Sequence, residues 1–316
     1  MNQAKVLNFF GLLLIMFGIS FAIPLFVAIF YGESLIRVFG LGMSILVLMG
    51  FLSWFFTKDN KQELSLSDGF VITVLFWIVL SVSGSIPFIL FGFGVVDSFF
   101  ESMSGITTTG ATVIAGLDDL PKSLLIYRQL LQWLGGMGLI VLAIAVMPLL
   151  GIGGGQLFKT QTPGPMSEQR LTPRITSTAR ALWSIYFVLT VLCIFAYRLA
   201  GMSYFDAVSH AFSTVSIGGF STHDLSIGFF DSLSIEIVCI TFMLLSAMSF
   251  AVHYSAIYRK QVLKYFYDPE LRFFVSLLIV ILGLVCLSLF TNDIDNPIRS
   301  GLFQTVSILT TTGFLT

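Results

Sequence analysis

Charged residues are scarce in this sequence. Only 10% of its 316 residues are Asp, Glu, Lys or Arg, and 56% are hydrophobic. Soluble domains carry roughly 25% charged residues, so the composition excludes a soluble globular protein. The net charge of −1 also gives no reason to expect a nucleic acid or an acidic ligand.

Cysteine and histidine are scarce as well, with three of each. Cys193, Cys239 and Cys286 all lie in apolar runs, which favours packed hydrophobic side chains over disulfides or metal ligands. The histidines are too scattered to predict a metal cluster. The sequence shows no nucleophile elbow, P-loop or dinucleotide fingerprint, so we expect no cofactor in this chain.

Long hydrophobic runs are what the sequence does contain. The run 11–30 would extend about 30 Å as a helix, enough to cross the hydrocarbon core of a bilayer. Only Lys5 precedes it and no cleavage site follows, so we expect a retained first span. The sequence predicts an all-α polytopic membrane protein with seven crossings. They are 7–31, 34–56, 69–94, 125–150, 181–202, 232–257 and 271–291.

Basic residues are unevenly divided between the two ends of these crossings. Eleven of the 16 fall in 1–6, 57–68, 151–180 and 258–272, which predicts that these segments are cytoplasmic. The formal charge is then 11 − 6 = +5 on the inner side and 5 − 11 = −6 on the outer side. An acidic outer face concentrates cations at an entrance.

Three shorter stretches, near 97–107, 204–215 and 298–309, form an internal repeat. Each begins with polar residues, is too short to cross a bilayer and ends in a Thr/Gly-rich segment, which is typical of a re-entrant half-helix. The three align without gaps, and their shared glycines are 109 and 94 residues apart. These glycines are Gly110, Gly219 and Gly313.

The repeated unit predicts a cation pore. A half-helix that enters from outside aims its partially negative C-terminal end at the membrane centre. The following segment has no helical hydrogen bonds, and its free carbonyls are tolerable at membrane depth only where they face water or an ion. Glycine supplies a positive φ without a side chain, and a threonine hydroxyl can anchor the segment to its own half-helix.

Three polar residues occupy equivalent positions inside the half-helices: Glu101, His210 and Gln304. We expect them to be buried and to hydrogen-bond the filter backbone. For His210 a role in pH sensing is the alternative.

With this repeat, the chain resembles the Trk/Ktr/HKT superfamily of potassium transporters, and most closely the TrkH/TrkG-type membrane subunit. The segment 128–138 (RQLLQWLGGMG) is similar to the family's sequence after the first filter, and 153–165 and 171–175 are similar to its cytoplasmic loop. The resemblance covers essentially the whole chain.

The resemblance implies a potassium filter lined by backbone carbonyls. Its residues would be Thr107, Thr108, Thr109 and Gly110; Ser216, Ile217, Gly218 and Gly219; and Thr310, Thr311, Thr312 and Gly313. Glycine at all three positions fits the potassium-selective pattern, since a serine in the first filter is associated with sodium preference. The resemblance further implies a homodimer in the cytoplasmic membrane and a cytosolic nucleotide-binding, TrkA-like partner on the basic inner loops. Passive flux and coupled symport both remain open.

The family has four such units around a pseudo-fourfold axis, and the repeat divides this chain accordingly. We expect an N-terminal two-helix extension at 1–67, pore unit 1 at 68–152, a cytoplasmic loop at 153–180, pore unit 2 at 181–260 and an incomplete pore unit 3 at 261–316. With the fourth unit missing, we interpret the chain as a fragment of a transporter.

Two alternatives to a pore remain at this point. One is a polytopic membrane enzyme that uses Asp97, Asp206 or His210 for acid–base chemistry, since ionisable residues inside membranes are functional candidates. The other is a non-conducting interaction subunit. Three equivalent glycine-bearing segments favour the pore, because an enzyme needs one asymmetric constellation.

Overall fold

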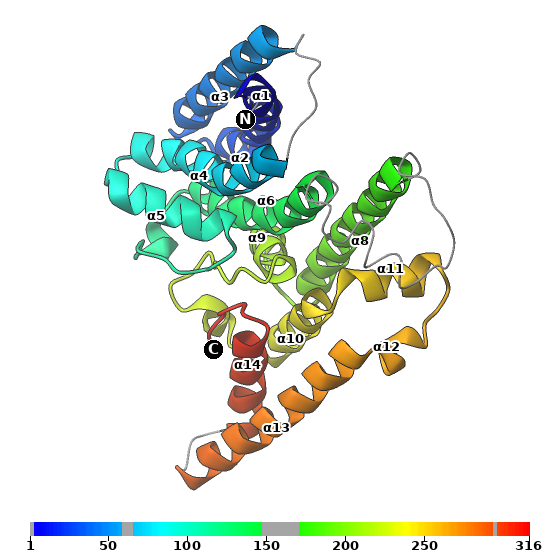
Figure 1. Cartoon of the computed structure of the whole chain (residues 1–316). Helices are drawn as coiled ribbons and strands as arrows, with labels where there is room; N and C mark the ends of the chain where they lie inside the picture. Colours follow the sequence, from blue (N-terminus) through cyan, green and yellow to red (C-terminus); the bar gives the residue numbers. More distant parts are fainter. Residues whose placement is uncertain (1–2, 59–65, 147–170, 293–295) are drawn as a thin grey trace.

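The chain is built from α-helices in the computed structural model (Figure 1), which describes residues 3–58, 66–146, 171–292 and 296–316. No strand occurs within these ranges. The helices are α1 (Gln3–Ser20), α2 (Ala22–Tyr31), α3 (Ile36–Thr57), α4 (Leu66–Phe91), α5 (Val95–Ile106), α6 (Lys122–Val146), α8 (Leu171–Leu199), α9 (Tyr204–Val215), α10 (Leu233–Ala247), α11 (Phe250–Tyr258), α12 (Lys264–Tyr267), α13 (Pro269–Thr291) and α14 (Pro297–Leu309), with short 3₁₀ turns η1 (Leu117–Asp119) and η3 (Ser226–Phe230).

Five helical segments of the described residues are long and apolar enough to cross a membrane. They are Gln3–Tyr31, Ile36–Thr57, Ser67–Phe91, Arg180–Leu199 and Pro269–Thr291. Each corresponds to one of the predicted crossings, which confirms the all-α polytopic membrane protein. The predicted crossing 125–150 coincides with α6 as far as Val146, and residues 147–150 lie outside the described part.

The predicted crossing 232–257 is wrong as a single helix. It consists of α10 and α11, which meet at an angle of 90°. Met248 and Ser249 are extended between them, with ψ of 146° and 122°. His253 satisfies a carbonyl that this break leaves open, because its Nε2–H donates to the Leu245 oxygen at 2.8 Å. Composition alone does not reveal such a break, since both halves are apolar.

The three predicted re-entrant stretches are separate short helices, α5, α9 and α14, of 12, 12 and 13 residues. At 1.5 Å per residue each is about 20 Å long, too short to cross a bilayer. The start of α9 shows why the polar heads matter. Ser203 accepts the Asp206 N–H at 3.1 Å and donates its hydroxyl to the Asp206 carboxylate at 2.7 Å, so Ser203 caps the helix and Asp206 holds the capping hydroxyl in place.

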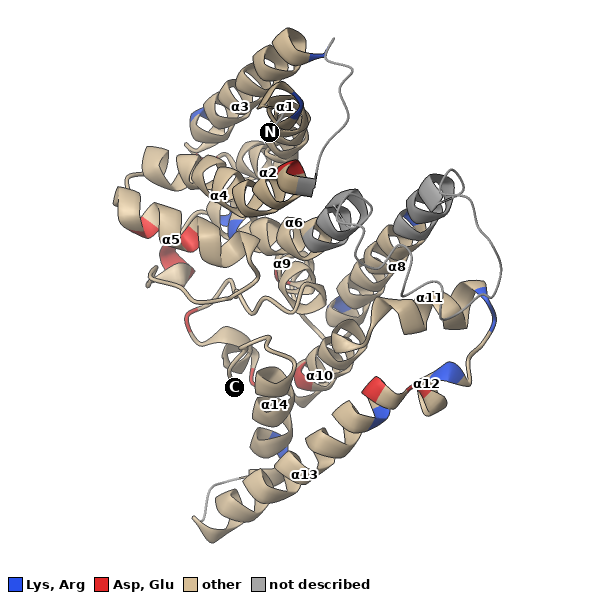
Figure 2. Cartoon of the chain, viewed as in Figure 1, with Lys and Arg blue, Asp and Glu red and all other residues tan. Residues whose placement is uncertain are grey.

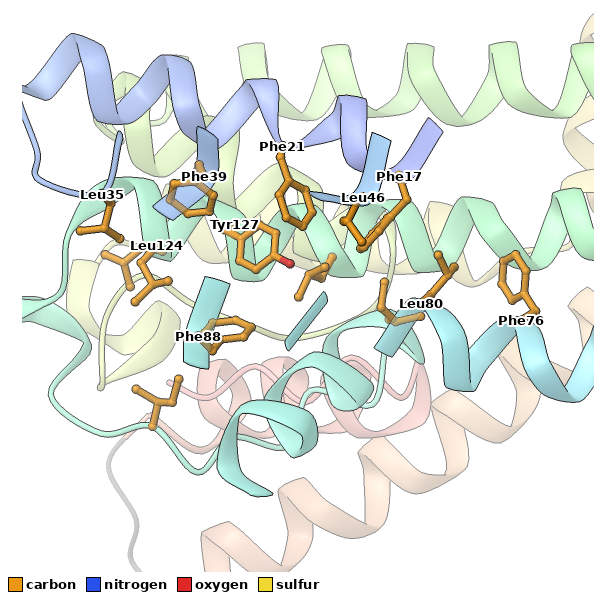
Figure 3. Packing of buried hydrophobic residues seen from close by; sticks show 14 of the residues in the cluster. Phe17, Phe21, Leu35, Phe39, Leu46, Phe76, Leu80, Phe88, Leu124 and Tyr127 are labelled. Atoms are coloured by element: carbon orange, nitrogen blue, oxygen red, sulfur yellow. The ribbon is translucent and has the colours of Figure 1, made fainter. Parts of the chain in front are cut away.

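The buried aromatic ring of Tyr127 on α6 lies at the centre of the N-terminal half of the molecule (Figure 3). Phe21, Phe39 and Phe88 surround it with ring centroids 5.2 to 5.4 Å away. Its hydroxyl donates to the Gly84 carbonyl at 2.7 Å. These contacts pack α1 to α4 against α6, and buried aromatic side chains of this size contribute much of the packing free energy.

Helices α1 and α3 approach each other closely through glycine. A Cβ atom on Gly50 would lie 2.6 Å from the Gly11 carbonyl oxygen, and one on Gly11 would lie 2.7 Å from the Trp54 nitrogen. Polar side chains cross the same interface, for example Ser53, whose hydroxyl donates to the Leu7 carbonyl at 2.9 Å. Small residues with interhelical hydrogen bonds are the usual means of helix association in lipid, where the hydrophobic effect between helices is absent.

Charged residues are distributed unevenly over the fold (Figure 2). Acidic residues gather on α5 and near the junction of α10 with α14, whereas Lys and Arg occur towards both ends of α3 and α8 and beyond the end of α11. The sidedness predicted from the sequence stays a prediction. The predicted cytoplasmic loop 153–180 lies outside the described residues up to 170, and α8 begins at Leu171.

We expect Gly50→Ala to destabilise the protein by about 1 to 3 kcal/mol, because the added methyl overpacks the α1–α3 contact. The measurement is the melting temperature in detergent. Gly40→Ala on the same helix is the matched control, since nothing lies within 4 Å of its added methyl. Equal melting temperatures for the two variants would contradict the proposed close contact.

Candidate functional site

All three half-helices end in the same backbone turn. The N–H of Thr109 bonds the Ser104 carbonyl at 2.9 Å, and the equivalent Gly218 to Ser213 and Thr312 to Ser307 bonds measure 2.8 and 2.9 Å. The residue before each of these donors is left-handed: φ is 55° at Thr108, 50° at Ile217 and 61° at Thr311. This conformation is a genuine outlier for a β-branched residue, and such strain costs on the order of 1 to 3 kcal/mol.

Glycine follows two residues later in each segment, again with a positive φ. The values are 77° at Gly110, 79° at Gly219 and 82° at Gly313. The positive φ predicted for the three glycines is therefore confirmed. The left-handed β-branched residue before each of them was not foreseen, since no sequence rule assigns threonine or isoleucine to that conformation.

The three extended segments lie side by side in chain order. A Cβ atom on Gly110 would collide with the Gly218 carbonyl oxygen, and one on Gly219 would collide with the Thr312 carbonyl oxygen. Nothing lies within 4 Å of the corresponding position on Gly313. Segments more than 90 residues apart in the sequence thus lie directly against one another.

Most carbonyl groups of the predicted filter residues are free. Among the described residues, no donor bonds the carbonyl oxygens of 107–110, and the same holds for 310–313. In the middle segment only the Gly218 oxygen accepts a hydrogen bond, from Gln132 of α6. Free carbonyls next to one another in a ring can replace the hydration shell of a cation.

Threonine hydroxyls anchor the first and third segments to their half-helices, as the sequence predicted. Thr107 donates to the Met103 carbonyl at 2.7 Å, and Thr310 donates to the Val306 carbonyl at 2.8 Å. Each is also 2.8 Å from the hydroxyl of the residue two positions on, which is Thr109 or Thr312. We call this hydroxyl pair the threonine brace.

Glu101 and Arg128 form a fully buried ion pair beside the first segment. Their Oε1 and Nε atoms are 2.7 Å apart and neither side chain is exposed. Glu101 also accepts from the Val113 N–H at 3.2 Å and from the Thr112 hydroxyl at 3.0 Å. The carboxylate therefore ties its half-helix to the backbone that leaves the filter.

Arg128 extends this network to the second segment. Its guanidinium donates to the Ser221 carbonyl at 3.1 Å and lies 4.4 Å from the centroid of the Phe220 ring. Arg128 and Gln132 were missed as individual site residues, although they fall in the family-like segment 128–138. Their spacing of four places both on one face of a helix, which is the signal that could have found them.

The other two half-helix residues occupy the expected positions with different partners. His210 is fully buried, with Nδ1 3.0 Å from the Asp206 carbonyl and Nε2 3.0 Å from the Ser221 hydroxyl. Gln304 is half-buried, contrary to the expectation of burial, and bonds the Thr316 carbonyl at 3.4 Å.

Many acidic residues of the outer side are bonded rather than freely solvated. Glu33 accepts the Lys122 N–H at 2.7 Å at the start of α6, and Asp224 accepts the Leu117 N–H at 3.1 Å. Glu236 pairs with Arg299 of α14 at 2.7 Å. The acidic outer face is thus also part of the framework that positions the half-helices.

His223 links the segment that follows α5 to the start of α9. It contacts the Asp118 carboxylate of η1, and its Nε2 is 3.4 Å from Asp206 of α9. Partial burial opposes its charge, but hydrogen bonds to Asp206 and Asp118 outweigh that effect and raise the pKa of His223 above its ordinary value. Hydrogen bonding to His223 in turn lowers the pKa of Asp118.

Among the described residues, no group of three or more His, Cys, Asp or Glu side chains could hold a metal ion. Asp97, a candidate acid–base residue, lies in the exposed first turn of α5. The fold and the site together define a multi-pass helical membrane protein whose re-entrant half-helices present backbone carbonyls, an arrangement suited to a cation.

Comparisons with known proteins identify the family. The profile described as "TrkH: Cation transport protein" matches residues 35–316. The chain belongs to this family of cation transport proteins, which excludes the membrane-enzyme alternative.

Individual relatives agree over nearly the whole chain. The Trk system potassium uptake protein TrkH of Halomonas elongata is 47% identical over 99% of this chain and 66% of its own length. TrkG of Escherichia coli K12 is 42% identical over 97% of this chain and 64% of its own length. The crystal structure of the potassium transporter TrkH from Vibrio parahaemolyticus is similar with a TM-score of 0.89, at 44% identity, over 100% of this chain and 66% of that one. The chain thus spans about two thirds of the length of these relatives.

We expect Glu101→Gln to destabilise the protein by about 3 to 5 kcal/mol, because it leaves the buried Arg128 charge without a counter-charge. Asp119→Asn, at an exposed carboxylate of the same outer side, should change stability by about 0.5 kcal/mol or less. Thermal unfolding in detergent measures both. A Glu101→Gln protein as stable as the Asp119→Asn control would show that the pair does not hold the two segments.

Stability should also depend on pH through His223. Because the pKa of His223 is raised in the folded state, its contribution to stability is complete below pH 6.5, the ordinary pKa of histidine. That contribution is lost as the pH rises through the folded-state pKa. The melting temperature should therefore fall over that range, and His223→Gln should remove the fall. A pH profile unaffected by His223→Gln would assign the dependence to other groups.

Proposed function

We propose that this chain is the pore-forming part of a potassium uptake system in the cytoplasmic membrane. One observation carries the proposal: three Thr/Gly-rich segments lie edge to edge, and glycine is required at Gly110 and Gly219, where two of them meet the carbonyl of the next segment. The relatives support potassium as the ion, since several are named Trk system potassium uptake proteins. Potassium is the substrate here and not a resident cofactor.

The half-helices supply the electrostatics of the proposed pathway. Each of α5, α9 and α14 ends directly at a filter segment, so the partially negative C-terminal ends of three helix dipoles point towards the same ring. Conduction also requires that the ion can leave the carbonyls that bind it. Several equivalent sites next to one another allow the ion to move on. The filter residues proposed to contribute carbonyls are 107–110, 216–219 and 310–313.

The ring needs a further segment next to Gly313. In the two observed junctions, the Gly218 carbonyl meets Gly110 and the Thr312 carbonyl meets Gly219. A further segment would meet Gly313 in the same way and would shield carbonyls that lipid cannot solvate. The greater length of the relatives supports a fourth unit in the working protein. This is the basis on which we propose four units around a pseudo-fourfold axis.

We further propose that the working protein is a homodimer with a cytosolic, nucleotide-binding, TrkA-like partner. The word "system" in the names of the relatives supports several components. On this chain the partner would meet the basic inner segments, where Lys58, Arg259, Lys260 and Lys264 are found. A negatively charged partner surface would be attracted there.

The test is rubidium flux into liposomes that hold a potassium gradient, with the protein expressed from its complete coding sequence. Gly110→Ser should lower the selectivity for potassium over sodium by about tenfold, equivalent to about 1.4 kcal/mol. The physical reason is that the added side chain displaces the Gly218 carbonyl. Gly40→Ala should leave the selectivity unchanged, because that glycine has open space around it.

Three outcomes would count against the proposal. Absence of rubidium flux from the unsubstituted protein would favour the non-conducting interaction subunit. Flux without preference for potassium would contradict the proposed ion. Unchanged selectivity in a folded Gly110→Ser protein would place the filter elsewhere.

A further inference from the structure

The three filter segments are not braced in the same way. The first and third carry the threonine brace, in which the first and third residues of the segment share a hydroxyl contact of 2.8 Å. The middle segment has Ser216 at its first position and Gly218 at its third, so it lacks the second hydroxyl. The Ser216 hydroxyl instead donates to the Ser213 carbonyl at 3.2 Å.

The side chain of Gln132 occupies the place of the missing threonine. A Cβ atom on Gly218 would collide with the Gln132 carboxamide, and the three nearest atoms to that Cβ all belong to Gln132. A side chain at 218 would therefore have to displace the Gln132 carboxamide from its present position. The backbone itself is no obstacle, because Gly218 is not among the glycines with a positive φ.

Gln132 holds the middle segment on both sides of Gly219. Its Nε2 donates to the Gly218 carbonyl at 2.5 Å, and its Oε1 accepts the Phe220 N–H at 3.0 Å. The side chain is fully buried. Four residues earlier on the same helix, Arg128 bonds the Ser221 carbonyl. Helix α6 thus helps to fix the course of the middle segment, together with the bonds that return this segment to α9.

The Gly218 carbonyl is also the atom that faces Gly110 across the junction of the first two segments. Its direction therefore sets both a coordinating dipole and the spacing between these segments. We infer that Gln132 is a positioning residue that determines ion specificity, doing for the middle segment what the threonine brace does for the other two. This inference rests on the proposed potassium pore.

The decisive experiment exchanges one brace for the other. Gln132→Leu removes both hydrogen bonds at similar volume and should lower the selectivity of potassium over sodium flux by about tenfold, while flux continues. Gly218→Thr alone should impair the filter by collision with Gln132. The double variant Gln132→Ala, Gly218→Thr rebuilds the threonine brace with Ser216, and should restore selectivity to within about twofold of the unsubstituted protein.

Gln129→Leu is the matched control. Gln129 is another buried glutamine of α6, and its amide atoms have no hydrogen-bond partner among the described residues. Replacing an unsatisfied buried amide by an apolar group of similar size is neutral or stabilising, so selectivity should not change. The melting temperature of each purified variant shows whether it is folded.

The outcomes separate this inference from the proposal beneath it. An unsubstituted protein without rubidium flux would overturn both. A conducting protein whose Gln132→Leu variant keeps its selectivity would overturn the role of Gln132 alone. If Gln132→Leu does not fold, the double variant decides: restored selectivity supports the exchange of braces, and a folded but unselective double variant contradicts it.

Discussion

The need to satisfy backbone polar groups at membrane depth governs this structure. Three segments leave the helical conformation there, and every N–H or carbonyl that they expose needs a partner, because lipid provides none. The turns at Thr108, Ile217 and Thr311 return some N–H groups to the half-helices. Hydroxyls, Glu101 and Gln132 bond further groups, which leaves a set of carbonyls without a hydrogen bond among the described residues.

Helix α6 provides hydrogen-bond partners for polar groups beside two of these segments. Tyr127 faces the aromatic cluster formed with α1 to α4, whereas Arg128 and Gln132 face the filter. One turn further on, a Cβ on Gly135 would collide with the Ile106 carbonyl, and one on Gly136 would lie 3.1 Å from the Ser216 Cβ. The glycine-rich end of segment 128–138 thus lets α6 approach the ends of two half-helices, so packing and site geometry depend on the same helix.

Pattern alone revealed the repeat, the half-helices and the glycine positions, because these are local features that recur at aligned positions. It did not reveal the partners. Of the three equivalent residues, Glu101 bonds an arginine and a backbone N–H. His210 bonds a serine and a helix carbonyl. Gln304 bonds the Thr316 carbonyl. The bend between α10 and α11 was also missed, since a buried histidine that satisfies the opened carbonyl has no periodic signal.

The sequence by itself determined the membrane environment, the helical class and the unit that is repeated three times, since hydrophobic length and glycine spacing act locally along the chain. Only the tertiary structure decided that Gly110 meets the carbonyl of Gly218, and that Gln132 stands where a threonine stands in the other two segments. These contacts join residues 86 and more apart in the sequence. They depend on how α6 and the half-helices pack, because whether a carbonyl is free or bonded is set by which helix lies against it.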